Sequence, residues 1–247
     1  MFALLATRYM KEDGPTEEAL AAVELKNHDH GSLNPRAHFQ KEITLEQYQR
    51  APKVAEPLGL FDCCPTTDGA AACILTRTEL ASKFTDRYVV IRGIAYAVTA
   101  GYWNTQFDQS WSFTSFRSTR EAAQAAYRMA GVTNPAEEID VAECHDCFTI
   151  TEIVNYEDLG FARTGEGWKF ATGGVTKLGG DLPVNTSGGL KSCGHPIGAS
   201  GVRMINNIAD QLLGRAGKMQ VKGAKVGLAH NLGGPGAVSA VAVLSQP

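Results

Sequence analysis

The sequence predicts an α/β fold, and two observations carry this prediction. Strand-like patterns at residues 88–98 and 139–143 are each followed by a helical pattern, and such alternation is typical of folds in which ligands meet the ends of strands. Glycines are concentrated late in the chain, since 16 of the 26 lie in residues 173–247. Because glycine permits backbone conformations that other residues avoid, we expect unusual turns near a ligand in this last third.

The composition excludes several classes of protein. The 247 residues carry 23 basic and 26 acidic side chains, a formal net charge of −3, and 44% of the residues are hydrophobic. This suits a globular chain with a sizeable core. It lacks the basic excess of a nucleic-acid-binding protein and the apolar run of about 20 residues that a membrane helix requires. We therefore expect a small molecule or another protein as partner, and neither nucleic acid nor membrane.

The cysteine content indicates the redox compartment. Six cysteines are too few for a disulfide scaffold in a chain of this length. The N-terminal residues also lack the basic leader and small-residue cleavage site of a signal peptide. The sequence therefore predicts a reducing, cytoplasmic location.

Two helices are predicted near the N-terminus, at residues 2–11 and 17–26. Residues 13–15, Asp-Gly-Pro, break the first helix, and Thr16 is expected to cap the second. Residues 27–57 are polar with little periodicity and predict an excursion over the surface. A short helix beginning at Thr44 and three histidines on a solvated loop belong to this excursion: His28, His30 and His38.

The middle of the chain predicts two strands and a helix. Residues 69–76 are small, apolar or β-branched, as in a strand buried on both faces, and residues 88–98 predict a second strand. Residues 118–131 have apolar residues at helical spacing. We expect Ser118 to cap this helix and Gly131 to end it.

The last part predicts a strand at 139–143 running into a helix that reaches about Tyr156, and a helix at 202–213. Strands at 225–230 and 237–244 follow, joined by a glycine-rich turn. Because the connection is short, we expect these two strands to form a hairpin.

His195 is the first candidate catalytic residue. It stands between glycines just before a helix, and Pro196 stiffens the backbone that follows it. Its unperturbed pKa of about 6.5 suits a general base. A loop histidine that caps the helix or binds a carbonyl group is an equally good interpretation of the spacing.

His145 and Cys147 form the second constellation. Residues two apart along an extended strand end project to the same side, and an imidazole beside a thiol can activate it as a nucleophile or an acid–base group. Cys144 and Cys147 could instead be half of a zinc site, or Cys147 could be a buried apolar thiol. No second metal-binding pair appears in the sequence, so we expect no metal.

The turn His230-Asn-Leu-Gly-Gly-Pro-Gly offers free backbone N–H groups that could bind an oxyanion. Glycine-rich hairpin turns usually serve only to reverse the chain, so this motif is weak alone. The neighbouring cysteines Cys63 and Cys64 are interpreted as structural.

Four segments carry a family resemblance: Asp68-Gly-Ala-Ala-Ala, His145-Asp-Cys-Phe, Asn185-Thr-Ser-Gly-Gly through Gly194-His-Pro, and His230-Asn-Leu-Gly-Gly. Together they resemble the thiolase superfamily, most closely its sterol-carrier-protein-type and archaeal branches, over nearly the whole chain. The His-Asp-Cys-Phe and Gly-His-Pro motifs, in this order and about 50 residues apart, are specific to the family. The terminal glycine turn is not.

The resemblance implies a duplicated α/β fold, a loop domain that holds coenzyme A, and a homodimer. Residues 87–247 would form the C-terminal βαβαβαββ half. Residues 1–86 would be the remainder of the N-terminal half, comprising the loop region and its last strand. The implied reaction is Claisen condensation, or thiolytic cleavage of a 3-oxoacyl-CoA, on coenzyme A thioesters and without a covalently bound cofactor.

The resemblance also implies roles for single residues. His195 would activate the nucleophile and help to bind an oxyanion, Cys147 would be the acid–base thiol, and His145 would orient substrate or an oxyanion-binding water. The amide of Gly233 would be an oxyanion donor, although the turn aligns in two registers. The oxyanion and substrate group would also include Asn231 and His230.

The acylated cysteine of the family has no counterpart at the expected motif. Cys63, Cys64, Cys73 and Cys193 all lie elsewhere, so we expect a thiolase-type acyltransferase that has little activity as this chain alone. Met1 also offers no cap to the first helix, which is unusual for a domain start. Two alternatives are a thiolase-like retro-aldolase acting on acyl-CoA side chains with a small acyl-CoA-binding partner protein, and a non-catalytic acyl-CoA-binding module.

Overall fold

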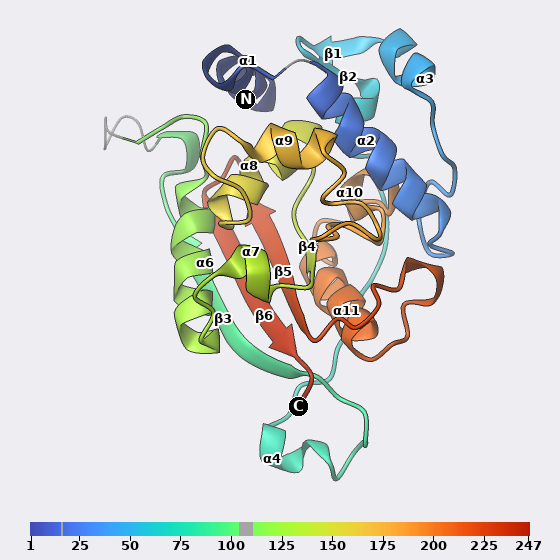
Figure 1. Cartoon of the computed structure of the whole chain (residues 1–247), viewed down its shortest axis with the longest axis vertical. Helices are drawn as coiled ribbons and strands as arrows, with labels where there is room; N and C mark the ends of the chain where they lie inside the picture. Colours follow the sequence, from blue (N-terminus) through green and yellow to red (C-terminus); the bar gives the residue numbers. More distant parts are fainter. Residues whose placement is uncertain (16, 104–110) are drawn as a thin grey trace.

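The computed structural model describes residues 1–15, 17–103 and 111–247, so the predicted cap Thr16 lies outside the described residues. Its centre is a four-stranded sheet (Figure 1), with the order β3 (Val90–Val98), β6 (Val238–Ser245), β5 (Val226–Gly233) and β4 (Val141–Glu143). β6 runs antiparallel to both of its neighbours, β3 and β5, whereas β4 runs parallel to β5. The predicted C-terminal hairpin is confirmed, although β5 extends to Gly233.

Two helices cover opposite faces of the sheet. α6 (Arg117–Ala130) packs on β3 and β6, and α11 (Ser200–Leu212) packs on β5 and β4. Glycines permit both contacts. A Cβ on Gly93 would lie 2.2 Å from the carbonyl oxygen of Ala126 in α6, and a Cβ on Gly227 would lie 2.5 Å from Ile208 in α11. Small residues in the strands therefore set how close the helices approach.

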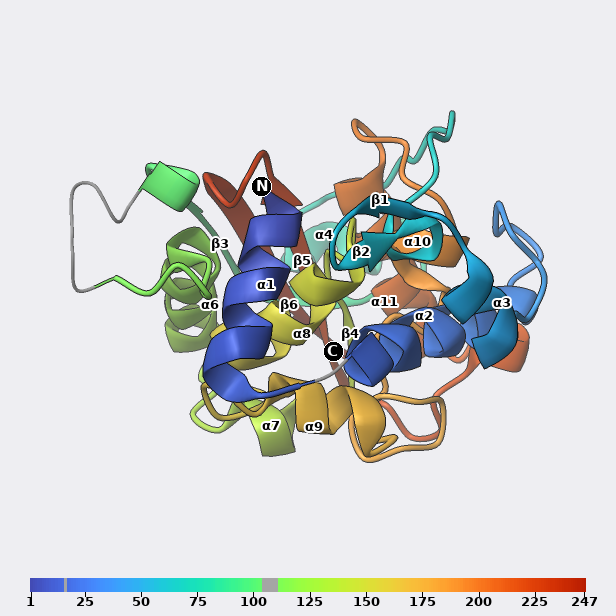
Figure 2. The ribbon, with the colours of Figure 1, turned by 90° about the horizontal axis from the view of Figure 1, so that it is seen from above.

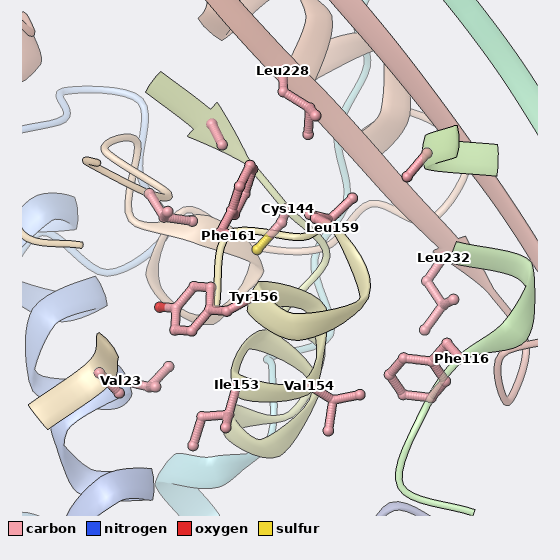
Figure 3. Packing of buried hydrophobic residues seen from close by; sticks show 14 of the residues in the cluster. Val23, Phe116, Cys144, Ile153, Val154, Tyr156, Leu159, Phe161, Leu228 and Leu232 are labelled. Carbon is pink, nitrogen blue, oxygen red and sulfur yellow. The ribbon is translucent and has the colours of Figure 1, made fainter. Parts of the chain in front are cut away.

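A second helical layer lies on the α6 side of the sheet (Figure 2). Its central helix is α8 (Thr149–Asp158), all of whose residues are buried, and it is covered by α1 (Phe2–Asp13), α2 (Glu17–Ser32) and α9 (Gly167–Thr172). Figure 3 shows Ile153, Val154 and Tyr156 of α8 in this core, in one cluster with Val23 of α2. The burial of α8 fixes the segment before it, which carries His145 and Cys147.

Short elements complete the fold: α3 (Leu45–Arg50), β1 (Lys53–Ala55), β2 (Leu58–Gly59), η1 (Leu60–Asp62), α4 (Thr78–Ala81), η2 (Gly101–Trp103), α7 (Pro135–Glu138), α10 (Gly189–Ser192) and η3 (Gly217–Met219). The third strand of the expected βαβαβαββ order is reduced to one parallel bridge between Ala142 and Val184. None of the helices in the described ranges is long and apolar enough to cross a membrane. The division of the chain at residue 86 stays a prediction.

The strand predicted at 69–76 is wrong. This segment has no regular structure, and Ile74 and Leu75 are 99% and 70% exposed. Its small and branched residues suit a sheet, but no described strand pairs with them, and a strand buried on both faces requires partners. The sequence pattern therefore indicated a preference for strand structure, but the segment does not form a strand in this fold.

The solvated loop predicted for the first histidines is also wrong, because α2 continues to Ser32. His28 and His30 are 4% and 3% exposed, and only His38 is exposed as expected. The burial of His30 is possible because Nδ1 donates to the carbonyl of Asn185 and Nε2 accepts from the amide of Leu178.

Two predicted helix caps are confirmed and one is wrong. Thr44 caps α3 through the amide of Gln47, and Gly131 ends α6 in the left-handed region at φ 73°. Ser118 does not cap α6, which begins one residue earlier. Its hydroxyl instead lies 2.9 Å from the carbonyl of Gly236 and binds the end of the hairpin.

One part of the sheet has no cover. On the side packed by α11, the outward residues of β3 and the adjoining end of β6 stay exposed and are mostly large and apolar, and no described helix or strand lies over them. We call this set the bare sheet face: Ile94 (49% exposed), Tyr96 (76%), Val98 (67%) and Val238 (40%).

Candidate active site

The candidate site lies at the carboxyl ends of the parallel strands β4 and β5, where α/β folds usually bind ligands. His145 lies two residues after the end of β4, and Asn231 lies near the end of β5. The loop between α10 and α11 brings His195 to the same place. Three segments far apart in the sequence therefore meet at one edge of the sheet.

His145 is buried and neutral. Its ring Nδ1 donates to the side-chain oxygen of Asn231 over 2.8 Å, which leaves Nε2 as an acceptor. Burial lowers the pKa of His145 to about 4, although the hydrogen bond to Asn231 acts in the opposite direction. At neutral pH the ring can therefore orient a water or a substrate group without carrying charge.

His195 is half-buried and held by Ser200. The Ser200 hydroxyl donates to the carbonyl of Pro196 over 3.0 Å, so it accepts from Nδ1 of His195 over 2.8 Å. The neutral ring then carries its proton on Nδ1 and presents an unprotonated Nε2. Burial first, and then the charge of Arg203, lowers the pKa of His195. This is the state that a general base requires.

The two candidate rings are brought together. His145 and His195 lie edge to face, with ring centroids 5.2 Å apart and an interplanar angle of 88°. The loop histidine that sequence spacing left ambiguous is therefore next to the strand-end histidine. At this separation the two neutral imidazoles are in direct contact.

Cys147 lies on the same segment as His145 and is 8% exposed, within the apolar cluster that α11 forms with the sheet. Burial raises the pKa of its thiol well above the usual range, so the sulfur is protonated at neutral pH. A protonated thiol in the free protein is suited to donate a proton. The described residues contain no group of three His, Cys, Asp or Glu side chains that could hold a metal ion.

His230 holds the backbone of His145 in place through a hydrogen bond. It is fully buried, its Nδ1 accepts the amide of His145 over 3.4 Å, and its Nε2 donates to the Thr119 hydroxyl over 3.1 Å. Burial lowers its pKa to about 3. Since both ring nitrogens bind protein atoms, His230 positions the strand end and leaves no ring nitrogen for substrate, whereas the sequence analysis grouped it with the substrate-binding residues.

Asn231 and Gly233 complete the predicted oxyanion group. A Cβ on Gly201, in the first turn of α11, would lie 3.1 Å from the side-chain nitrogen of Asn231, so that amide lies over the start of the helix. Gly233 is exposed and pairs with Val238 at the last position of the hairpin. Its role as an oxyanion donor stays a prediction.

Asp146 was missed by the sequence analysis. It is fully buried and accepts from the amide of Leu190 over 2.6 Å and from the side chain of Asn27 over 2.9 Å. It therefore joins the His145 segment to the glycine loop before His195. The sequence did contain a signal for this role. Side chains alternate between the two faces of an extended segment, so Asp146, between His145 and Cys147, was expected on the face opposite to theirs.

Two openings flank the site. A groove of about 270 Å³ lies between α11 and the sheet and is lined mostly by apolar residues, together with His230 and Asn231. A cavity of about 460 Å³ lies beyond Pro196 and includes two arginines, Arg36 and Arg203. Both openings are lined in part by residues that follow His195, the groove by Ile197 and the cavity by Pro196.

Comparison with known proteins places this geometry in a family. Over 246 residues the chain is 44% identical to an acetyl-CoA acetyltransferase from Methanothermobacter thermautotrophicus, and over 239 residues it is 38% identical to sterol carrier protein 2 from Bos taurus. The matches cover 100% and 96% of this chain. They cover only 63% and 44% of the two relatives, so the chain spans less than two thirds of their length.

Two solved structures have the same fold as this chain. A Ltp2-ChsH2(DUF35) aldolase superposes with a TM-score of 0.87 at 29% identity, over 99% of this chain and 62% of that one. A monomeric SCP2-thiolase-like protein from Mycobacterium smegmatis, 15% identical, shares the fold with a TM-score of 0.69 over 100% of this chain and 51% of its own. The family model described as thiolase C-terminal domain-like matches residues 99–246, which include His145, Cys147 and His195. The chain thus has a thiolase-like fold and belongs to the thiolase family through this C-terminal domain.

Proposed function

We propose that this chain carries the proton-transfer and oxyanion-binding part of a thiolase-type acyl-CoA C-acyltransferase, which forms or cleaves 3-oxoacyl-CoA. The observation that carries the proposal is the meeting of His145 and His195, with ring centroids 5.2 Å apart, beside the buried thiol of Cys147. The substrate would be a coenzyme A thioester, and no bound cofactor is needed. The similarity to acetyl-CoA acetyltransferases supports this assignment.

Each group has a chemical part in thiolytic cleavage. When the carbon–carbon bond of the 3-oxoacyl chain breaks, the leaving acetyl-CoA carries an enolate, and the protonated thiol of Cys147 would supply the proton to its α-carbon. Nε2 of His145 would hold a water against the thioester oxygen. Nε2 of His195 would take the proton of the attacking thiol, and the resulting cation would stabilise the oxyanion.

The acylated cysteine of the proposed reaction is not assigned to any residue of this chain. Cys64 lies on the segment that pairs with Cys147 and His195, but its sequence matches no nucleophile motif. We therefore expect complete acyl transfer to require a nucleophile supplied from outside these 247 residues, in a homodimer or with another chain. The six free cysteines favour a reducing, cytoplasmic location.

A second function has its own support. The aldolase that superposes on 99% of this chain is named together with ChsH2(DUF35). Retro-aldol cleavage of an acyl-CoA side chain also passes through a thioester enolate, but it needs no acylated cysteine. In that case the chain would release an aldehyde or ketone, in company with a small acyl-CoA-binding partner.

Exchange of the acetyl-CoA methyl protons for deuterium tests the shared half-reaction. In D₂O we expect this chain to exchange them faster than buffer alone, because the enolate forms without an acylated cysteine. Cys147→Ala should lower the rate by about a hundredfold, within the usual range for an acid–base group. The exposed Cys73 gives the matched control Cys73→Ala, which should exchange normally. An unchanged rate in Cys147→Ala would overturn the assignment of this thiol.

Two further measurements separate the alternatives. Acetyl-CoA binding by calorimetry without any proton exchange would indicate a non-catalytic binding module. With the missing nucleophile supplied by a full-length relative, thiolysis of 3-oxoacyl-CoA would support the acyltransferase. Release of an aldehyde or ketone from 3-hydroxyacyl-CoA would support the lyase.

A further inference from the structure

Cys64 and Cys147 lie directly opposite each other across a short antiparallel pairing. Cys63 and Phe148 form the bridge, and the amide of Cys64 donates to the carbonyl of Cys147 over 3.0 Å. Directly opposite residues of an antiparallel pair project to the same face, and hydrogen-bonded pairs have Cα atoms about 5.5 Å apart. The two thiols therefore share one face.

The surroundings distinguish these two cysteines from their neighbours. Cys147 is buried in the apolar cluster beside α11, and the half-buried Cys64 packs against that same cluster. Cys63 projects to the other face, where its thiol lies 3.5 Å from the carbonyl of Gly59. Cys144 belongs to the other core cluster. Because side chains alternate between faces along the two paired segments, only Cys64 and Cys147 share a face.

A buried ammonium group lies beside the pair. Lys191 has a fully buried side chain whose Nζ is 3.4 Å from Oε2 of Glu24, and neither atom has a hydrogen bond within the described residues. Burial raises the pKa of Cys64 to about 11, and the charge of Lys191 opposes this rise. Cys64 is also the more exposed of the two thiols, so an oxidant would reach it first.

We propose that Cys64 and Cys147 form an intramolecular disulfide when the protein meets a peroxide. The thiolate of Cys64 attacks one peroxide oxygen, the oxygen–oxygen bond breaks, and hydroxide leaves, giving a sulfenic acid on Cys64. The sulfur of Cys147 then displaces this hydroxyl as water and loses its own proton. Two thiols are oxidised, and one hydrogen peroxide is reduced to two waters. Disulfides usually join Cα atoms 4.4–6.8 Å apart, a range that includes the spacing of about 5.5 Å typical of directly opposite antiparallel residues.

The bond would act on the candidate site in two ways. It would remove the thiol proton of Cys147, and it would tie the site to the segment of residues 63–66. That segment also touches the glycine loop, because Thr66 and His195 form a parallel bridge. The bond itself does not depend on the proposed function, whereas its effect on proton exchange does.

The test uses the purified chain treated with hydrogen peroxide and then alkylated. Before alkylation we expect the intact mass to fall by two hydrogens, and after alkylation a non-reduced digest should contain one peptide pair joined through Cys64 and Cys147. Cys64→Ser and Cys147→Ser should abolish this pair, whereas Cys63→Ser should keep it. A link through Cys63 or Cys144, or oxidation confined to the exposed Cys73, would overturn the proposal.

Two controls test whether the variants fold and whether the disulfide affects proton exchange. Thermal unfolding followed by circular dichroism shows whether Cys64→Ser folds, and if it does not, Cys64→Ala and the mapped wild-type digest give the answer. The treated wild type should lose proton exchange and recover it with dithiothreitol, and Cys64→Ser should keep exchanging after the same treatment. A mapped disulfide in a chain that never exchanges protons would refute the proposed function and leave the oxidation site standing.

Discussion

The imidazole of His145 meets that of His195 edge to face, with the centroids 5.2 Å apart. Each ring is fixed by a partner on its Nδ1, namely Asn231 for His145 and Ser200 for His195. These partners, rather than the histidines alone, decide which nitrogen faces the site. Both Nε2 atoms are left as acceptors, so the pair suits a ligand or water that donates hydrogen bonds.

Replacing Ser200 by alanine should change the tautomer of His195. The Nδ1 proton loses its acceptor, and the neutral ring should shift toward carrying its proton on Nε2. Nitrogen NMR of the imidazole reports this change directly. In the same spectrum His28, whose Nδ1 is hydrogen-bonded to the carbonyl of Lys41, should stay as in the wild type. A His195 signal identical in both proteins would mean that Ser200 does not set the tautomer.

Replacing Gly189 by alanine should destabilise the fold through Asp146. The new Cβ would lie 2.2 Å from Oδ2 of this buried carboxyl, at a φ of +60°. Gly214→Ala is the matched control, because its φ is +67° and nothing lies within 4 Å. Both variants bear a left-handed cost of roughly 1–2 kcal/mol.

The Gly189→Ala variant should lose about 2 kcal/mol more than the control, since the buried carboxyl of Asp146 must move away from its partners. Urea denaturation gives both free energies of unfolding. Equal losses in the two variants would show that Asp146 adapts freely, and its role in joining the two loops would then fail.

Local patterns predicted much of this fold. The strands at 88–98, 225–230 and 237–244, the helices α6 and α11 and the stop at Gly131 follow from periodicity and turn chemistry, which act over a few residues. His145, Cys147 and His195 were proposed as site residues because they lie in motifs at a strand end and in a glycine loop. Long-range packing brings the two rings together, and neither residue spacing nor secondary-structure propensity predicts that packing.

The failures have a physical cause as well. Residues 69–76 have strand character without a described partner, and burial of His28 and His30 depends on acceptors more than a hundred residues away or in the next loop. Ser118 binds the hairpin end instead of its own helix. Tertiary contacts satisfy the two histidines and Ser118, so local patterns assigned these polar residues to solvent or to a cap.

Acid should weaken this fold in part through His30. Burial, followed by the charge of Lys26, lowers its pKa to about 4 in the folded state, against about 6.5 when unfolded. Between these values the unfolded chain binds a proton that the folded chain does not, so stability falls as pH drops from 7 toward 4. From pH 7 to pH 5 His30 should contribute a loss of about 2 kcal/mol.

Urea midpoints at pH 7 and pH 5 measure this contribution. His30→Gln should show a smaller fall in stability between the two pH values than the wild type, whatever its stability at pH 7. His38→Gln, at an exposed position, should fall as the wild type does. A fall in His30→Gln as large as the wild type's would assign the acid sensitivity to other groups.

The bare sheet face should make this chain associate with itself. Ile94, Tyr96, Val98 and Val238 are exposed together, and contiguous apolar patches of this kind are rare on soluble monomers. The double variant Tyr96→Glu, Val98→Lys places opposite charges there without changing the net charge, and should reduce association. Leu4→Lys, at an exposed apolar position on α1, serves as the control and should not. Light scattering over a range of concentrations measures the mass, and a wild type that stays a monodisperse monomer throughout would contradict the expectation.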